Sequence, residues 1–371
     1  MRKTICWFTE NYPPNNGGMS QSADRIVQEL RKTCTVHVFH FTNKIAPFFT
    51  EANVGGSYTA IPVYLDSSHT LNVLWSHIKQ HPLIINDAIL VSYGSQLCQR
   101  GLPLIAKWLK LPLVTCFRGN DFDSGIFSSK KQHILYAIEH SAAVACVTKE
   151  KQERILSLNL NSNIHFTPNS IDLAQWIPLT SDIKLAKSYR KAAISKKYRL
   201  GFIGYQKPKK GISFFLEALQ LSNMCDSIFL QFVGEISSDL AETLTLQNIP
   251  YSLVLPNSKT ELMAYYLSCD VIIIPSIYDG MPNVLFEAGA LKIPIIASKA
   301  GGLKDVLTND NAYIFETISQ ASLLKTLDKF NEDSLVTKQQ KAEELYTTIQ
   351  TNYTPTLESK NYLNIFKNIN K

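Results

Sequence analysis

Two acidic residues eight positions apart, Asp279 and Glu287, enclose the stretch of the chain best suited to bind a ligand. The β-branched run at 271–274 is typical of a strand buried on both faces of a parallel sheet. A polar loop with Gly280 follows, and a helical pattern begins at Asn283. The first turn of such a helix has unpaired backbone N–H groups and the positive end of the helix dipole. Both features favour an anion such as phosphate.

The two carboxylates have a different chemistry from the loop that they flank. A carboxylate does not bind phosphate, but it accepts hydrogen bonds from sugar hydroxyl groups. Taken singly, Asp279 also fits a turn residue and Glu287 a solvated helix position. Together with the anion-binding loop, they indicate a sugar nucleotide as the ligand.

The same stretch resembles the signature of the retaining glycosyltransferases of family 4, which have the GT-B fold. In that signature an acidic residue, commonly Glu, is followed by seven others and then Glu, and the run PSIYDGMPNVLFEAGALKIPIIAS extends the match. The resemblance implies that Glu287 holds the nucleotide ribose and that Asp279, one methylene shorter than Glu, lies by the donor sugar. It also implies that the intervening residues contact phosphate or sugar. These are Gly280, Met281, Pro282, Asn283 and Val284.

The resemblance extends to a basic loop that follows the strand expected at 198–205. Family members have a Gly, an Arg directly after it and a Lys-Gly pair five residues further on. Gly204 and the pair at 210–211 keep this spacing, whereas Tyr205 stands in the place of the Arg. Lys207 is offset but fits a second positive charge.

A fixed ammonium group stabilises the negative charge that develops on a diphosphate as the sugar leaves. We therefore expect Lys210 to be catalytic and Lys207 to contact the donor, whereas Lys209 fits a solvated loop lysine. In the family the backbone after a later strand contacts the nucleotide base, which implies Val254 and Leu255 as base contacts.

The N-terminal half opens with strand, loop, helix and strand, as in a Rossmann-like unit. The loop at 11–20 contains Gly17 and Gly18 but no GxGxxG dinucleotide fingerprint. The pair resembles the family's glycine loop near the donor phosphate and the acceptor. The alternative is that the two glycines only permit the turn.

The strand expected at 111–117 ends in Arg118, Gly119, Asn120 and Asp121. Ligands bind at the carboxyl ends of strands in such sheets, and many family members have His-Gly-x-Asp at this point. An Arg in the His position is no general base, but it can bind phosphate or donate to a sugar hydroxyl. We expect Arg118 and Asp121 to be catalytic-site residues. The alternatives are a surface ion pair for Arg118 and a local cap for Asp121.

The predicted fold class is α/β, with the GT-B arrangement of two Rossmann-like doubly wound domains facing across an interdomain cleft. The predicted divisions are an acceptor-side domain at 1–175, a lysine-rich linker at 176–197 and a nucleotide-sugar domain at 198–352. The predicted helix at 353–371 returns to the first domain, as is usual in this fold.

Composition narrows the function classes. The 371 residues are 45% hydrophobic and 18% charged, which fits a globular two-domain protein. A net charge of +6 is too small to indicate a nucleic-acid partner. The seven scattered cysteines contain no CxxC pair and indicate a reducing compartment. Because no apolar run suits a signal peptide or membrane span, we expect a cytoplasmic location, compatible with peripheral contact at the inner face of the membrane.

The resemblance therefore implies a retaining transferase that moves a sugar from a UDP- or GDP-sugar to a hydroxyl of a glycan or lipid-linked acceptor. Polysaccharide or lipopolysaccharide synthesis is the family's usual role, without a cofactor or bound metal. One alternative is an inactive relative that binds sugar nucleotides as a regulatory subunit, which the departures Arg118, Tyr205 and Asp279 favour. The other is an epimerase or glycosidase on the same fold; the phosphate loop between the two carboxylates argues against a glycosidase.

Overall fold

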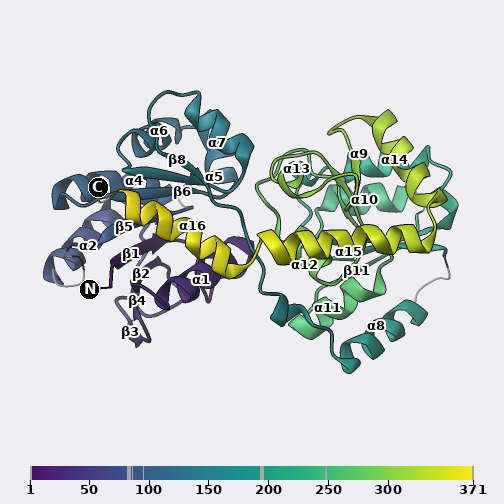
Figure 1. The fold of residues 1–371 in the computed structure, drawn as a ribbon, viewed down its shortest axis with the longest axis horizontal. Helices are drawn as coiled ribbons and strands as arrows, with labels where there is room; N and C mark the ends of the chain where they lie inside the picture. Colours follow the sequence, from purple (N-terminus) through teal and green to yellow (C-terminus); the bar gives the residue numbers. More distant parts are fainter. Residues whose placement is uncertain are drawn as a thin grey trace. The chain divides into compact units, whose positions relative to one another are not determined.

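The structure, a computed structural model, describes residues 2–81, 85, 87–94, 96–192, 196–246 and 249–369. The chain divides into two compact units (Figure 1). The first unit comprises Met1–Ser170 and Pro355–Lys371, and the second comprises Ile171–Thr354.

The first unit is built on an eight-stranded sheet in the order β3-β4-β2-β1-β5-β6-β7-β8. Strand β3 runs antiparallel to β4, and the other neighbours pair in parallel. The strands are β1 (Thr4–Thr9), β2 (Thr35–Phe41), β3 (Thr50–Asn53), β4 (Gly56–Ile61), β5 (Ile89–Tyr93), β6 (Leu113–Phe117), β7 (Ala143–Cys146) and β8 (Ile164–Phe166). The helices are α1 (Gly18–Arg31), α2 (Ser67–Gln80), α4 (Gln96–Leu109), α5 (Asn120–Asp123), η1 (Gly125–Phe127), α6 (Lys131–Glu139), α7 (Lys149–Leu156) and α16 (Pro355–Asn368).

Alternation along β1 explains why helices cover both faces of this sheet. Ile5 and Trp7 lie in one hydrophobic cluster with side chains of α1 and α16. Cys6 and Phe8 point to the opposite face and pack with side chains of α2 and α4. Successive strand residues face opposite sides of a sheet, so a fully apolar strand needs a helical layer on each side. Figure 1 shows α16, in yellow, lying along α1.

The second unit has a six-stranded parallel sheet in the order β11-β10-β9-β12-β13-β14. Its strands are β9 (Tyr198–Ile203), β10 (Ile228–Val233), β11 (Tyr251–Val254), β12 (Val271–Ile274), β13 (Ile295–Ser298) and β14 (Tyr313–Phe315). Its helices are η2 (Leu173–Trp176), α8 (Thr180–Ala192), η3 (Pro208–Lys210), α9 (Ile212–Gln220), η4 (Cys225–Ser227), α10 (Ser238–Leu246), α11 (Lys259–Ser268), α12 (Asn283–Ala290), α13 (Leu303–Val306), α14 (Gln320–Glu332) and α15 (Leu335–Asn352).

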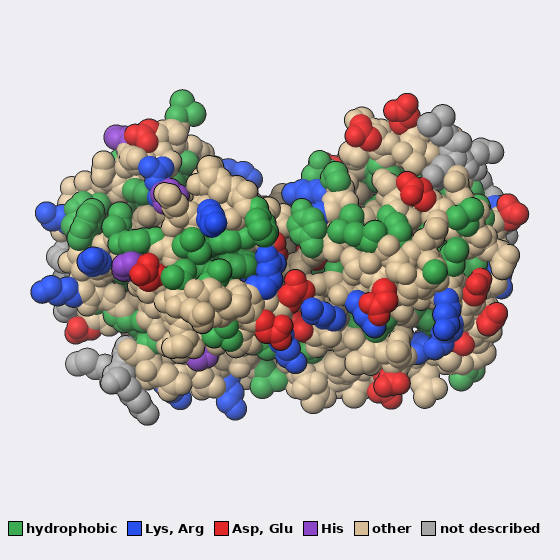
Figure 2. All heavy atoms as spheres, turned by 90° about the horizontal axis from the view of Figure 1, so that it is seen from above, with side chains coloured by type: hydrophobic (Ala, Val, Ile, Leu, Met, Phe, Trp, Pro, Cys, Tyr) green, Lys and Arg blue, Asp and Glu red, His purple; other side chains and the backbone are tan. Residues whose placement is uncertain are grey.

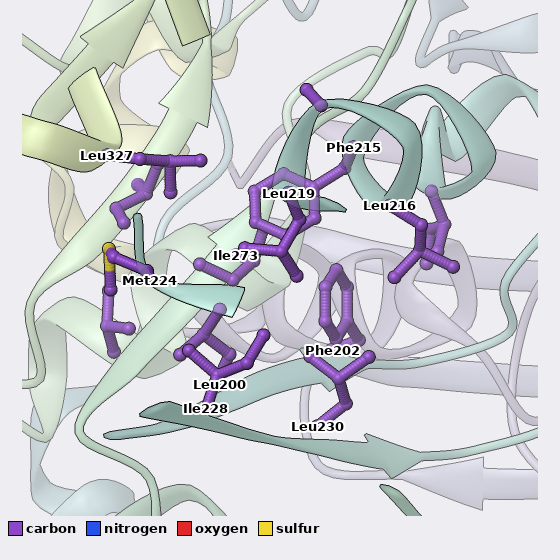
Figure 3. Close-up of a cluster of buried hydrophobic side chains, with 14 of the residues drawn as sticks. Leu200, Phe202, Phe215, Leu216, Leu219, Met224, Ile228, Leu230, Ile273 and Leu327 are labelled. Atoms are coloured by element: carbon purple, nitrogen blue, oxygen red, sulfur yellow. The ribbon is translucent and has the colours of Figure 1, made fainter. Parts of the chain in front are cut away.

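A packed core fixes α9 against this sheet, as Figure 3 shows. Phe215 and Leu219 of α9 meet Phe202 of β9 and Ile273 of β12, and all four side chains are buried. Helix α9 begins at Ile212, directly after the basic loop. The packing of α9 therefore holds the end of that loop in place.

The strand order brings together the two loops of the second unit that carry the predicted site residues Lys210 and Asp279. The chain proceeds from β9 outward to β10 and β11, then returns to lay β12 on the other side of β9. In open parallel sheets, ligands bind at the carboxyl ends of strands where the order reverses in this way. The loops after β9 and β12 carry Lys210 and Asp279, so both lie at this reversal. The predicted α/β class with two doubly wound units is confirmed.

The stretch expected as a linker is largely helical. Helix α8 is part of the second unit, where the ring of Tyr189 stacks on Tyr265 of α11 at 4.3 Å between centroids. The guanidinium of Arg190 lies 2.7 Å from Asp270. These contacts explain why the division falls after Ser170, five residues before the predicted boundary at 175.

Figure 2 shows how charge is spread on one face of the molecule. Blue and red side chains are interspersed over the part of the second unit seen there, and hydrophobic side chains gather on the first unit. This mixture differs from the continuous basic stripe that a nucleic-acid-binding surface presents. All seven cysteines are free, and six are buried.

Gly211 offers a test of how the basic loop is packed. It has φ +68°, and a Cβ there would lie 2.1 Å from the backbone oxygen of Pro275. Gly211→Ala should therefore destabilise the protein by about 2–4 kcal/mol, through backbone strain and overpacking. The matched control is Gly204→Ala, since Gly204 has φ +90° but a Cβ at that position would meet no atom within 4 Å. Urea denaturation should show a clearly smaller loss for the control; equal losses would contradict the close approach.

Candidate active site

Asp279 joins the two predicted loops through a double ion pair. Its carboxylate lies 2.5 Å from the ammonium of Lys210 and 3.2 Å from that of Lys209. The side chains are 12%, 23% and 14% exposed, so the cluster is largely withdrawn from water yet open at one side. The hydroxyl of Ser276 also donates to Asp279 at 3.4 Å. The structure thus brings together two residues that the sequence predicted, Lys210 and Asp279, and adds Lys209.

The charge state of this cluster follows from two opposed effects. Burial raises the pKa of Asp279, but the charges and hydrogen bonds of Lys210 and Lys209 outweigh it and leave the pKa below its usual value. The carboxylate is therefore ionised at neutral pH. Two ammonium groups on one carboxylate leave a local excess of one positive charge, which suits an anionic ligand.

Two glycines allow the loop after β12 to lie this close to its neighbours. Gly211 meets the strand end at Pro275, and a Cβ at Gly301 (φ +49°) would lie 1.9 Å from the backbone oxygen of Asp279. Backbone hydrogen bonds complete the arrangement, from Ile277 N to Lys209 O and from Gly302 N to Gly280 O, both at 2.8 Å. The position of Asp279 is thus set by backbone packing on both sides.

The helix after Asp279 begins without a side-chain cap. Pro282 occupies the N-cap position of α12, which starts at Asn283. Gly280 and Met281 are buried, whereas Pro282, Asn283 and Val284 are half-buried.

Glu287 is held by a residue that sequence reasoning missed. The hydroxyl of Tyr266, from α11, donates to Glu287 at 2.5 Å. Burial, reinforced by the charge of Glu287, raises the pKa of Tyr266, so the phenol stays protonated and remains a donor. Lys259 and Trp176 lie near this pair, with the Lys259 ammonium 5.1 Å from the Trp176 ring and the Trp176 ring 5.8 Å from that of Tyr266. Nothing in the spacing of these aromatic residues distinguished them from core residues.

The remaining predicted donor contacts of the second unit lie at the ends of adjacent strands. Gly204 is exposed, and Leu255 is 61% exposed. Gly204 N donates to Val233 O, and Gly234 N donates to Val254 O, so the ends of β9, β10 and β11 are aligned. Lys207 is exposed and its ammonium lies 5.4 Å from the centre of the Tyr205 ring. Lys209, rather than Lys207, shares the ion pair with Asp279 that Lys210 makes.

Arg118 lies in the interior of the first unit. Its side chain is 2% exposed, and its guanidinium donates to Thr167 O at 3.1 Å, to the hydroxyl of Tyr362 at 3.2 Å and to the side-chain oxygen of Asn169. It also pairs with Glu358 of α16 at 3.3 Å. The structure therefore gives Arg118 a set of structural partners and turns its guanidinium toward the C-terminal helix.

Glu358 is the centre of this buried cluster. Its side chain is 1% exposed and also pairs with Arg25 of α1 at 3.0 Å, while Ser170 donates to it at 2.6 Å. One carboxylate thus pairs with two guanidinium groups from separate segments. The cluster ties α16 to α1 and to the segment that leaves the first unit. Glu358 could not be paired with Arg118 from the sequence, because 240 positions separate them.

Asp121 caps the turn that follows Arg118. Its carboxylate accepts backbone N–H bonds from Arg118 at 2.8 Å, Gly119 at 2.6 Å and Phe122 at 3.1 Å. This geometry corresponds to the local cap that was the alternative at the sequence level. Gly17 and Gly18 are exposed, and Gly17 precedes α1 with φ +116° and open space around its Cβ position.

Two features are absent from the part of the chain that the structure describes. Within those residues, no cluster of three or more His, Cys, Asp and Glu side chains is arranged to hold a metal ion. Among the described helices, none combines the length and apolar character needed to span a bilayer.

Comparison with known proteins finds a family that most of the second unit resembles. Residues 184–347 match the family described as Glycosyl transferases group 1. The second unit is thus similar to this family over most of its length. The whole chain matches the structure of Anabaena HepE in complex with UDP and glucose, with a TM-score of 0.77, 13% identity, and coverage of 99% of this chain and 100% of that one. That likeness shows the GT-B fold for the chain.

Two curated relatives match part of the chain. The putative teichuronic acid biosynthesis glycosyltransferase TuaC of Bacillus subtilis is 24% identical over 67% of this chain and 62% of its own length. The UDP-Gal:alpha-D-GlcNAc-diphosphoundecaprenol alpha-1,3-galactosyltransferase of Escherichia coli is 23% identical over 54% of each chain. The matched region thus spans between about half and three fifths of these relatives. The predicted GT-B fold and the resemblance to glycosyltransferases are confirmed, whereas the assignment to family 4 stays a prediction.

The buried cluster around Glu358 leads to a prediction on stability. Glu358→Gln removes the charge that compensates Arg118 and Arg25, and leaving buried charges unpaired costs about 3–5 kcal/mol. We expect a large loss of stability in thermal and urea unfolding. The matched control is Glu343→Gln, which breaks the exposed ion pair with Lys292 and should change stability little. Wild-type-like stability of Glu358→Gln would contradict a structural role for Arg118.

Proposed function

We propose that this chain transfers a sugar from a nucleotide-sugar donor to a hydroxyl group of a glycan or lipid-linked acceptor. The observation that carries the proposal is the cluster of Lys209, Lys210 and Asp279 within the region that matches Glycosyl transferases group 1. Two ammonium groups stand at the reversal of strand order, where an α/β sheet binds its ligand. The start of α12 adjoins them through the same loop.

The donor would bind by exchange of one anion for another. The carboxylate of Asp279 pairs with both ammonium groups. A diphosphate carries more negative charge than a carboxylate and has more acceptor oxygens. Lys209 and Lys210 can therefore form ion pairs with it in place of Asp279. The freed carboxylate could then accept hydrogen bonds from hydroxyls of the donor sugar. Glu287, held by Tyr266, would accept those of the ribose.

The transfer step needs positive charge beside the diphosphate, because negative charge develops there as the donor bond is cleaved. The bond from the anomeric carbon to the diphosphate oxygen is cleaved, and a bond from that carbon to the acceptor oxygen forms. The acceptor's hydroxyl proton passes to the departing phosphate oxygen, so no side-chain base is needed. Lys209 and Lys210 would stabilise the diphosphate charge, and with them we propose a reaction without a metal or other cofactor and with retention of anomeric configuration.

The relatives support a choice of substrates. HepE binds UDP and glucose in its structure, and the name of the E. coli relative specifies UDP-Gal and a diphosphoundecaprenol-linked acceptor. TuaC is named for teichuronic acid biosynthesis. We propose a UDP-sugar as donor, a GDP-sugar as the alternative, and cell-envelope polysaccharide as the product. A lipid-linked acceptor would bring this chain to the cytoplasmic face of the membrane as a peripheral protein.

A second candidate is a relative that binds sugar nucleotides without transferring them. The observation that favours it is the position of Arg118, whose guanidinium is occupied by Glu358 and Asn169 where many family members carry a His. Tyr205, in place of the family's Arg, is the second departure. The retained pairing of Lys210 with Asp279 favours the transferase instead.

The function is tested in two steps, both with EDTA present. A thermal-shift screen against UDP, GDP, ADP, CDP and their sugar conjugates identifies the donor, since a ligand at about a hundred times its Kd adds about 2.7 kcal/mol of stability. Product analysis of that donor with lipid-linked and oligosaccharide acceptors then detects transfer. Binding with neither transfer nor hydrolysis would favour the non-catalytic candidate, and no binding would overturn both.

Variants of the basic loop separate its three lysines. Lys210→Ala should lower kcat by about 10²–10³-fold, because it removes one group that stabilises the developing charge. Lys209→Ala should lower it by a similar order, whereas Lys207→Ala, whose ammonium lies over Tyr205, is the matched control with a much smaller effect. Steady-state kinetics with the identified donor measures all three. An unchanged kcat in Lys210→Ala would contradict the assignment.

A further inference from the structure

A groove in the first unit lies between α2 and the chain that leads into β3. Its volume is about 650 Å³, which is within the ~300–1,000 Å³ range of small-molecule sites. The described residues that line it are Phe48, Thr50, His69, Asn72, Val73, Ser76, His77, Gln80 and His81. All of them belong to the first unit, so this groove is separate from the Lys210 cluster of the second unit.

The lining has a distinctive chemistry. It contains no Asp, Glu, Lys or Arg, and only Phe48 and Val73 are apolar. An anionic ligand would therefore lack a permanent countercharge here. The polar groups are amides, hydroxyls and imidazoles, which donate and accept hydrogen bonds without a full charge.

Several of these polar groups are available to a ligand. Within the part of the chain that the structure describes, no protein group hydrogen-bonds the side chains of Asn72, Ser76 or Gln80. Burial, reinforced by the nearby His81, lowers the pKa of His77. His77 is therefore neutral at pH 7, with one ring nitrogen that donates and one that accepts.

An aromatic ring is held at the groove by a costly backbone conformation. Phe48 has φ +56°, which is rare for a bulky residue and persists only where the surroundings impose it. A backbone hydrogen bond from Phe48 N to Ala60 O at 2.9 Å fixes it. Its ring stacks on His77 with centroids 5.4 Å apart, yet the residue remains 42% exposed. The negative face of an aromatic ring attracts positively polarised C–H groups.

We propose that this groove binds a neutral, hydroxyl-rich ligand, namely a segment of a glycan chain. The hydroxyls of such a chain would pair with Asn72, Ser76 and Gln80, and the C–H face of one sugar ring would lie against Phe48. The role of this glycan as acceptor or product of the enzyme rests on the proposed function. The binding itself does not, because it needs neither a donor nor Lys210.

The test is calorimetric titration of the intact protein, without nucleotide, with neutral gluco-, manno- and galacto-oligosaccharides of four to six units. We expect one series to bind in the micromolar to millimolar range. Phe48→Ala should weaken that binding at least about tenfold, the scale of one lost aromatic contact. The matched control is Phe49→Ala, because Phe49 is 46% exposed but does not line the groove; its binding should equal that of the wild type.

Gln80→Leu provides a second variant in case Phe48→Ala fails to fold, and it should also weaken binding because an exposed amide at the groove is lost. Three results would overturn the proposal. They are no binding of any neutral oligosaccharide, binding that neither variant weakens, and stronger binding of a charged oligosaccharide such as oligogalacturonate. Because no donor is present, none of these results bears on whether the Lys210 cluster supports transfer.

Discussion

The carboxylate of Asp279 is the group on which the account of this protein depends. Burial by itself would favour the neutral acid, yet two ammonium groups keep Asp279 ionised. The reciprocal effect is that one carboxylate holds Lys209 and Lys210 at the end of the sheet. This arrangement exists because Gly211 and Gly301 let the backbone pack directly against the loop on both sides. A Cβ at Gly211 would overlap the backbone oxygen of Pro275, and one at Gly301 would overlap that of Asp279.

A second carboxylate, Glu358, also pairs with two cationic side chains, in the first unit. The Glu358 and Arg118 side chains are 1% and 2% exposed, and only Arg25 reaches 16%. In the Asp279 cluster all three side chains keep 12–23% exposure. The enclosed pair of Arg118 and Glu358 therefore suits a structural joint, because it has no side from which a diphosphate could approach.

The sequence was sufficient for the fold class and for naming Lys210 and Asp279 as site residues, which the structure brings together. The apolar runs of β9 and β12 mark buried parallel strands, and the loops that follow such strands meet at one edge of the sheet. Lys209, Tyr266 and the partners of Arg118 were missed, because their roles depend on side-chain direction and on contacts between distant segments. Arg118 meets Glu358 across 240 positions, a relation that no local pattern encodes. The lysine-rich pattern at 176–197 gave no sign of the aromatic contact between Tyr189 and Tyr265, which packs α8 in the second unit.

The central claim is that the cluster of Lys209, Lys210 and Asp279 binds the diphosphate of a nucleotide. The most direct measurement is equilibrium binding of nucleoside diphosphates beside their parent nucleosides at several salt concentrations. We expect one diphosphate to bind at least about a hundredfold more tightly than its nucleoside, equivalent to about 2.8 kcal/mol. The difference should shrink as salt rises, because the site is partly exposed. Equal affinity for a nucleoside and its diphosphate, at every salt concentration, would contradict the claim.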